Sequence, residues 1–220
     1  MMNSTQSPSA DYYLDRYEAG SDRWTRLKET DKLADAQIST MSTVIRHDAP
    51  YTILDVGCGT LWTSFKIAET FPNVRIHGID FAYEAIIAQY PYLIEKLGSF
   101  SITFGKADLF TYRSDSFYDC LCDIGLFHHL VPGDWERYAA QIDHLLRPGG
   151  SMFLHTFHTS DANWNKPSSG GHIRKGYYCH YHDLSSLGKI FGAICSKITE
   201  VELCSHEEHI VGLYHMVKAE

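Results

Sequence analysis

The sequence lacks the features that mark nucleic-acid-binding and membrane proteins. It contains no run of Lys and Arg, and its formal net charge is -8 at pH 7. A protein that follows a phosphate backbone needs such a run to neutralise it, so the composition argues against nucleic-acid partners. The chain also has no apolar stretch long enough to cross a bilayer and no apolar core of a signal peptide. We therefore expect a soluble, cytoplasmic protein without membrane contact.

Paired cysteine motifs are absent as well. The six cysteines include no CxxC pair, and several lie in apolar runs, where a reduced and buried thiol is the expected state. The histidines number 13. However, neither His155 with His158 nor Cys179 and His180 with His182 has the spacing of a known zinc motif. A solvated loop rich in aromatic residues explains these histidines and this cysteine as well as a metal site does, and we predict no metal site.

The 220 residues, 44% of them hydrophobic, suffice for one domain with a substantial core. Residues 1–10 are polar and predict a mobile tail, and residues 11–220 predict a single domain. Aromatic residues crowd the segment 11–47, which we interpret as an N-terminal lid over a ligand. Packing of a short aromatic helix on the domain explains the same residues equally well.

Strand-like and helix-like segments alternate along most of the chain, which predicts a parallel sheet with helices on both faces. A helix is expected from Asp31 to about Arg46, and a break at Pro91 in the helical segment 83–97. Asp134 is placed to cap the helix that follows it. The expected strands cover residues 52–56, 73–80, 100–107, 117–125 and 151–157.

The last third of the chain departs from this alternation. Residues 158–182 show neither a helical nor a strand period, and a loop of this length is more often functional than idle. We interpret it as a substrate-side insert. A helix over residues 184–194 follows, and two strands, 197–203 and 212–218, then predict a hairpin that forms an antiparallel edge of the sheet.

The stretch around which the chain is organised is residues 54–60 (LDVGCGT), in which an apolar strand ends at Gly57 and Gly59. Such a turn lets the backbone approach a ligand closely, and the following helix directs its first N–H groups to the same place. Asp80 lies 23 positions beyond Gly57, close to the offset at which an acidic residue accepts the hydroxyls of a ribose.

Further polar residues end the later strands. Asp108, followed by Leu109, is placed to hold an adenine amino group and enclose its ring, although capping of a turn explains Asp108 as well. Asp123, His128 and His129 should face the same crevice, because ligands bind outside the carboxyl ends of parallel strands.

Residues 54–60, Asp80, Asp108 with Leu109, the strand ending at Asp123 and residues 145–150 (LLRPGG) resemble the successive motifs of class I S-adenosylmethionine-dependent methyltransferases. The resemblance implies an α/β, Rossmann-like, doubly wound fold. Its sheet would be mostly parallel and seven-stranded, with an antiparallel C-terminal strand and helices on both faces. Residues 16–20 (RYEAG) with Trp24, and residues 122–130 (CDIGLFHHL), are similar to the small-molecule group around thiopurine and tellurite-resistance methyltransferases.

The resemblance implies that S-adenosyl-L-methionine is the cofactor. Asp80 would hold the ribose, Asp108 and Leu109 would meet the adenine, and Asp55 and Asp123 would lie near the ammonium or sulfonium end. The residues expected to contact the cofactor are Tyr17, Trp24, Asp55, Gly57, Cys58, Gly59, Thr60, Asp80, Phe81, Asp108, Leu109, Asp123 and Ile124.

One position departs from the family pattern. The family often has a third glycine after the Thr, whereas this chain has Leu61 and Trp62. The departure puts close helix packing on the methionine moiety in doubt. Trp62 also argues against a nicotinamide enzyme, because the dinucleotide fingerprint needs glycine at that place.

Methyl transfer from a sulfonium depends mainly on alignment of the acceptor and exclusion of water. A general base is needed where the acceptor is an alcohol, phenol or thiol, and His128 and His129 are the candidates. For a small-molecule acceptor with an O, S or N nucleophile, the candidate contacts are Tyr12, Tyr13, Trp164 and Tyr178. A protein or peptide acceptor, or a catalytically silent protein that binds the cofactor and serves a regulatory role, remains open.

Overall fold

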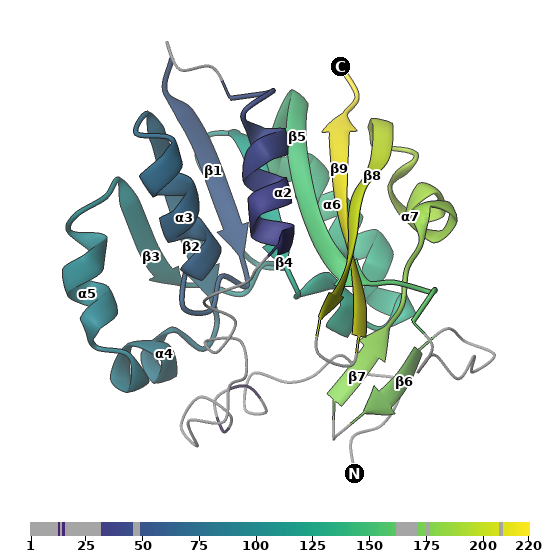
Figure 1. Ribbon diagram of the computed structural model, residues 1–220, viewed down its shortest axis with the longest axis horizontal. Helices are drawn as coiled ribbons and strands as arrows, with labels where there is room; N and C mark the ends of the chain where they lie inside the picture. The colour runs from purple at the N-terminus through teal and green to yellow at the C-terminus, as the bar shows by residue number, and fades with distance from the viewer. Residues whose placement is uncertain are drawn as a thin grey trace.

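A computed structural model shows the architecture of the chain (Figure 1). The residues that it describes are 13, 15, 32–45, 49–161, 171–174, 177–206 and 209–220. Within these ranges, no helix is both long and apolar enough to cross a bilayer.

A seven-stranded sheet in the order β3-β2-β1-β4-β5-β9-β8 forms the centre of the molecule. All neighbouring pairs from β3 to β5 are parallel, and β9 is antiparallel to both β5 and β8. The strands are β1 Tyr51–Val56, β2 Val74–Asp80, β3 Ile102–Lys106, β4 Tyr118–Ile124, β5 Leu146–Phe157, β8 Cys195–His206 and β9 His209–Lys218. The predicted fold class is confirmed.

Helices cover both faces of this sheet, because successive strand residues point to opposite sides. Ile53 belongs to the core beneath α2 and α3, whereas its neighbour Leu54 belongs to the core beneath α6 and α7. Figure 1 shows α2 and α3 in front of the sheet and α6 behind it. The helices are α2 Lys32–Met41, α3 Trp62–Thr70, α4 Tyr83–Gln89, α5 Tyr92–Leu97, α6 Trp135–Leu145 and α7 Leu184–Phe191.

The break predicted at Pro91 is confirmed. Helix α4 ends at Gln89 and α5 begins at Tyr92, with Pro91 between them at φ -62, an angle that its ring favours. Helix α2 is shorter than predicted, since it ends at Met41 rather than near Arg46. Its buried residues pack in the core of the sheet, so this part of the segment 11–47 covers the sheet face.

One local prediction at the start of α6 is wrong. Asp134 precedes the helix, but its side chain makes no capping hydrogen bond, because the chain enters α6 through a 3-10 turn, Pro132–Asp134. Helix α6 ends at Leu145, and the two glycines of the segment 145–150 lie within β5, which already begins at Leu146. Its pairing with β4 at Leu146 and again from Ser151 brackets an irregularity that accommodates them.

One correction and one confirmation concern the end of the chain. The predicted loop 158–182 contains a second, two-stranded antiparallel sheet, formed by β6 Gly171–Arg174 and β7 Tyr177–His180. The hairpin predicted at the sheet edge is confirmed: β8 is the edge strand, and β9 pairs antiparallel with β5 on one side and β8 on the other. Figure 1 shows β1 and β5 pointing toward the end of the molecule where β6 and β7 lie.

Candidate functional site

The turn after β1 has the backbone conformation that its glycines predict. Gly57 and Gly59 have φ of 62 and 51 degrees, in the left-handed region. The backbone N–H groups of Gly57 and Cys58 both donate to the carbonyl of Ile79, at 2.9 and 3.2 Å. A Cβ atom on Gly57 would lie 2.6 Å from Cδ1 of Leu126. The turn is therefore fixed between the ends of β2 and β4.

Leu61 takes the left-handed conformation as well, at φ 59, although it stands where the family often has glycine. A non-glycine residue there costs about 1–2 kcal/mol. Its side chain is fully buried, and a Cβ on Gly78 of β2 would lie 2.4 Å from its Cδ2 atom. The absence of a side chain at Gly78 thus makes room for Leu61. Sequence reasoning missed this pairing, for which the glycine inside a strand was the available signal.

Asp80, at the end of β2, bonds to the glycine turn. Its Oδ2 accepts from the backbone N–H of Gly59 at 3.1 Å, and its Oδ1 accepts from that of Ala82 at 2.8 Å. The side chain is buried, and burial raises the pKa of its carboxyl group above the ordinary value. Asp80 is therefore held by backbone groups, at the place where an acid follows the second strand.

Asp55 lies beneath the same turn with one oxygen unsatisfied. Its Oδ2 accepts from the hydroxyl of Ser64 at 2.6 Å, whereas its buried Oδ1 has no hydrogen-bond partner among the residues that the structure describes. Burial is the main cause that raises the pKa of this carboxyl to about 7, and the charges of Asp123 and Asp80 add to it. A buried carboxylate oxygen without a donor is unfavourable. The residues present therefore fit a cationic ligand group, such as the ammonium of S-adenosylmethionine.

Asp123, at the end of β4, differs from Asp55 because protein groups occupy its carboxylate. Its Oδ1 accepts from the N–H of Leu126 at 2.8 Å, and its Oδ2 accepts from the N–H of Phe127 at 3.1 Å and the hydroxyl of Tyr138 at 2.6 Å. Burial is the main cause that raises its pKa to about 6. These bonds hold the turn after β4 on helix α6.

Asp108 and Leu109 are adjacent in sequence but have different surroundings. Asp108 is exposed, and its Oδ1 accepts from the N–H of Phe110 at 2.9 Å. This is the turn-capping bond that the sequence analysis gave as the alternative to a contact between Asp108 and adenine. Leu109 is buried in the core on the α6 side of the sheet. Of the other residues predicted to contact the cofactor, Cys58 and Ile124 are half-buried, and burial is the main cause that raises the pKa of the Cys58 thiol.

Aromatic rings link the end of β2 to the end of β4. Tyr13 lies 5.4 Å from Phe81 and 6.1 Å from His129, measured between ring centroids. Phe81 directly follows Asp80 in the chain. The structure therefore places Tyr13, predicted to contact the acceptor, between Phe81, predicted to contact the cofactor, and His129, predicted to act in catalysis. The predicted contacts Tyr12, Tyr17, Trp24 and Trp164 lie outside the described residues.

His128 and His129 form the 3-10 turn Phe127–His129, and both are buried. The His128 ring stacks on Phe157 at 4.1 Å and bonds to the backbone of His155. Burial, with smaller effects of neighbouring imidazoles, lowers its pKa well below the ordinary value. The Nδ1 atom of His129 lies 2.8 Å from the carbonyl oxygen of Tyr178, on β7.

Sequence reasoning did not predict how many imidazoles gather beyond these two. The buried histidines near them come from β5, β7 and the segments that follow: His155, His158, His180 and His182. Trp135 lies 4.6 Å from His180 and 5.2 Å from His182, and the hydroxyl of Tyr178 lies 3.1 Å from Nδ1 of His180. In the part of the chain that the structure describes, no three His, Cys, Asp or Glu residues are grouped to hold a metal ion.

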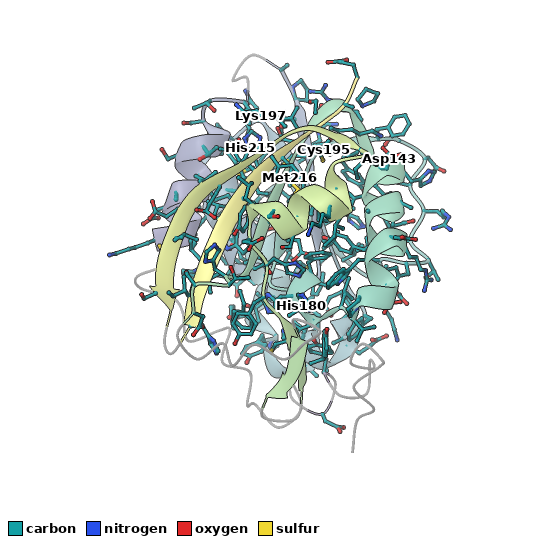
Figure 2. All side chains as sticks on the ribbon, turned by 90° about the vertical axis from the view of Figure 1, so that its right-hand side faces the viewer. Asp143, His180, Cys195, Lys197, His215 and Met216 are labelled. Carbon is teal, nitrogen blue, oxygen red and sulfur yellow. The ribbon has the colours of Figure 1, made fainter. Side chains whose placement is uncertain are left out.

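These observations divide the site in two. We name residues 55–61 and 78–82 the glycine side, and residues 125–131, 155–161 and 177–182 the histidine side. Figure 2 shows His180 in the lower half of the molecule, whereas Asp143, Cys195 and Lys197 lie in the upper half. The strand ends and the hairpin thus meet at one end of the sheet.

Comparisons with known sequences agree with this arrangement. Residues 53–150 match the model of a family described as a methyltransferase domain. Cyclopropane-fatty-acyl-phospholipid synthase of Escherichia coli (strain K12) is 23% identical over 167 residues, which cover 69% of this chain and 42% of that protein. Trans-aconitate 2-methyltransferase of Streptomyces avermitilis is 30% identical over 119 residues, which cover 54% and 42%. The chain spans less than half the length of these two curated relatives.

Solved structures share the fold over nearly the whole chain. The 1,6-didemethyltoxoflavin-N1-methyltransferase of Burkholderia thailandensis superposes with a TM-score of 0.69 at 18% identity, covering 96% of this chain and 87% of that one. Magnesium protoporphyrin IX methyltransferase of Synechocystis PCC 6803, solved with S-adenosylhomocysteine, gives 0.70 at 16% identity and covers 96% and 100%. Residues 53–150 thus match a methyltransferase domain, and the chain shares its fold with solved methyltransferases.

Proposed function

We propose that this protein transfers a methyl group from S-adenosylmethionine to a small molecule. The observation that carries the proposal is the unpartnered, buried Oδ1 of Asp55 beneath the left-handed turn of Gly57 and Gly59. When bound, the cofactor supplies an electrophilic methyl carbon on a sulfonium, whose positive charge already activates the leaving group. The protein's own part is to bind, align and exclude water.

Each residue of the glycine side has a role in this proposal. Asp55 accepts a hydrogen bond from the methionine ammonium, since no protein donor occupies its Oδ1. Asp80 accepts the ribose hydroxyls and keeps the turn in place through Gly59. Asp108 and Leu109 flank the adenine. For Asp123 we propose a positioning role instead of cofactor contact, because backbone N–H groups and Tyr138 engage its carboxylate.

A small-molecule acceptor is supported by the names of similar proteins and by charge. The relatives and structural neighbours include enzymes named for trans-aconitate, 1,6-didemethyltoxoflavin and magnesium protoporphyrin IX. The net charge of -8 disfavours a nucleic-acid acceptor. Tyr13, which lies between Phe81 and His129, is placed to contact cofactor and acceptor together.

Calorimetric titration with S-adenosylhomocysteine tests the cofactor assignment. We expect wild-type protein to bind it and Asp80→Asn to bind about 10- to 100-fold more weakly, because a hydrogen bond to a charged group contributes about 1.5–3 kcal/mol. Asp115→Asn is the matched control, since Asp115 is exposed and precedes β4. No binding by the wild type, or equal binding by Asp80→Asn, would overturn the assignment. Transfer of labelled methyl to a panel of phenols, thiols, acids and amines tests the activity.

A further inference from the structure

The tautomer of His129 follows from its hydrogen bond. The carbonyl oxygen of Tyr178 carries no proton, so the Nδ1 atom of His129, 2.8 Å away, must be the donor. In the neutral ring, Nε2 then carries the lone pair. The bond reaches from the turn after β4 to strand β7, across 49 residues of sequence. The hairpin of β6 and β7 therefore fixes which nitrogen of His129 is basic.

His129 also lies between the two sides of the site. The ring of Tyr13 packs against the His129 ring and also against Phe81, which follows Asp80 in the chain. On the hairpin side, the hydroxyl of Tyr178 bonds to His180. A group placed between the end of β2 and the hairpin therefore lies where cofactor and acceptor meet.

His128 is the weaker proton acceptor of the two. Its ring is stacked on Phe157, and its buried Nδ1 has no partner in the described part of the chain. The imidazoles of His129, His182 and His209 add to the effect of burial, which already lowers the pKa of His128 far below neutrality. A base with so low a pKa takes protons poorly at neutral pH.

The histidine side offers little to a charged acceptor. Residues 125–131, 155–161 and 177–182 include no Lys or Arg that would pair with a carboxylate. The carboxylates nearby are already paired: Asp161 lies 3.1 Å from the His209 ring, and Glu200 lies 3.3 Å from the His158 ring. Figure 2 shows Lys197 near the opposite end of the molecule. Within these three ranges an acceptor would meet imidazoles and aromatic rings, which suit a group that arrives neutral. Arg174, which pairs in register with Tyr177 in the hairpin, lies outside them.

We propose that the acceptor carries a phenol or thiol group and that Nε2 of His129 takes up its proton. The acceptor O–H or S–H bond breaks, and the proton passes to Nε2. The electron pair left on oxygen or sulfur forms the bond to the methyl carbon, while the carbon–sulfur bond of the sulfonium breaks and its pair goes to sulfur. The imidazolium then releases the proton to water. This inference rests on the proposed function and specifies its substrate class.

A chromophoric acceptor analogue tests the proton transfer without turnover. In the complex with S-adenosylhomocysteine, bound 4-nitrophenol or 4-nitrothiophenol is titrated by absorbance, because its ionised form absorbs at longer wavelength. His129→Asn keeps an amide N–H for the Tyr178 carbonyl but has no basic nitrogen. We expect the wild type to ionise the probe about tenfold more than His129→Asn at the same pH. His215→Asn is the control, since His215 stacks on Phe153 and bonds to Ser151.

Measurements of kcat and NMR spectroscopy provide two further tests. With methyl donor present, His129→Asn should lose about 100-fold or more in kcat on weakly acidic phenols, and much less on nitrophenols that are already ionised. In 15N-histidine-labelled wild-type protein, NMR should show His129 protonated at Nδ1, which needs no variant.

Three outcomes overturn the inference while S-adenosylhomocysteine still binds. They are equal probe ionisation in the wild type and His129→Asn, a His129 ring protonated at Nε2 when neutral, and no binding or methylation of any phenol or thiol tested. Loss of S-adenosylhomocysteine binding by the wild type is the separate failure that removes the proposed function.

Discussion

The glycine side and the histidine side both bury ionisable groups, but burial shifts the pKa values of the two sets in opposite directions. On the glycine side, burial raises the pKa of Asp55 and Asp80. On the histidine side, burial lowers the pKa of His128 and His182. A buried carboxylate is stabilised by an incoming cation, whereas a neutral imidazole tolerates an uncharged ligand and can take a proton from it. The difference assigns the cationic cofactor to one side and the neutral acceptor to the other.

The two sides also differ in how they are assembled. The glycine side consists of residues at the ends of β1 and β2 and in the turns that follow them. Its hydrogen bonds are made within these two turns, to the end of β2 and to Ser64 of α3. The histidine side is joined by contacts between segments far apart in the chain, such as His129 with Tyr178. Changes on the first side should therefore act on the turn, and changes on the second should act on the packing of the hairpin.

The largest effect is expected from Gly78→Ala on the glycine side. The added Cβ would lie 2.4 Å from Cδ2 of Leu61 and 2.9 Å from Sγ of Cys58, so we expect a loss of about 1–3 kcal/mol in the free energy of unfolding. Urea denaturation measures it. In a double-mutant cycle, Leu61→Ala should make the added methyl much less costly. Additive losses in the double variant would show that the two residues do not share the space.

A smaller effect should follow from Tyr138→Phe, which tests the junction between the sides. The change removes the 2.6 Å bond to Asp123, and we expect a loss of about 1.5 kcal/mol in stability at pH 8. Binding of S-adenosylhomocysteine should change less than threefold, because Asp123 positions a turn in our proposal. Calorimetry on the folded variant measures this, and a much weaker affinity would instead give Asp123 the direct cofactor contact that the sequence predicted.

The smallest effects are expected in the pH dependence of stability. The pKa of Asp55 is raised to about 7 from 3.8, so its contribution is present below pH 3.8 and is lost as the pH rises through 7. The pKa of His128 is lowered below 6.5, so stability is lost as the pH falls below 6.5. Each slope is at most about 1.4 kcal/mol per pH unit.

Denaturation curves between pH 4.5 and pH 8 separate the two contributions. Asp55→Asn should remove the loss that accumulates as the pH rises from 4.5 to 7. His128→Phe should reduce the loss that accumulates as the pH falls below 6.5, while keeping the ring stack on Phe157. If either variant ran parallel to the wild type at every pH, its residue would not titrate as the burial implies.

Particular residues show where prediction from sequence succeeded. Pro91 fixes its own φ and lacks an N–H, so the break between α4 and α5 follows from the residue itself. Gly57 and Gly59 adopt the left-handed conformation for the same local reason. Where local rules compete, prediction failed: Asp134 is a good capping residue, yet the 3-10 turn before α6 leaves its side chain without that role.

The sequence alone determined the strand–turn–helix order, the glycine turn and the acids at the strand ends, because these depend on backbone preferences and on a period that neighbouring residues share. Tertiary structure decided what these groups do. Among the described residues, Asp55 keeps an unpartnered oxygen while both oxygens of Asp123 are bonded, since the backbone N–H groups of the turn after β4 and the hydroxyl of Tyr138 point to Asp123. Leu61 fits a left-handed position because Gly78 faces it from β2. The basic nitrogen of His129 is set by a carbonyl 49 residues away, and no local pattern encodes a contact at that separation.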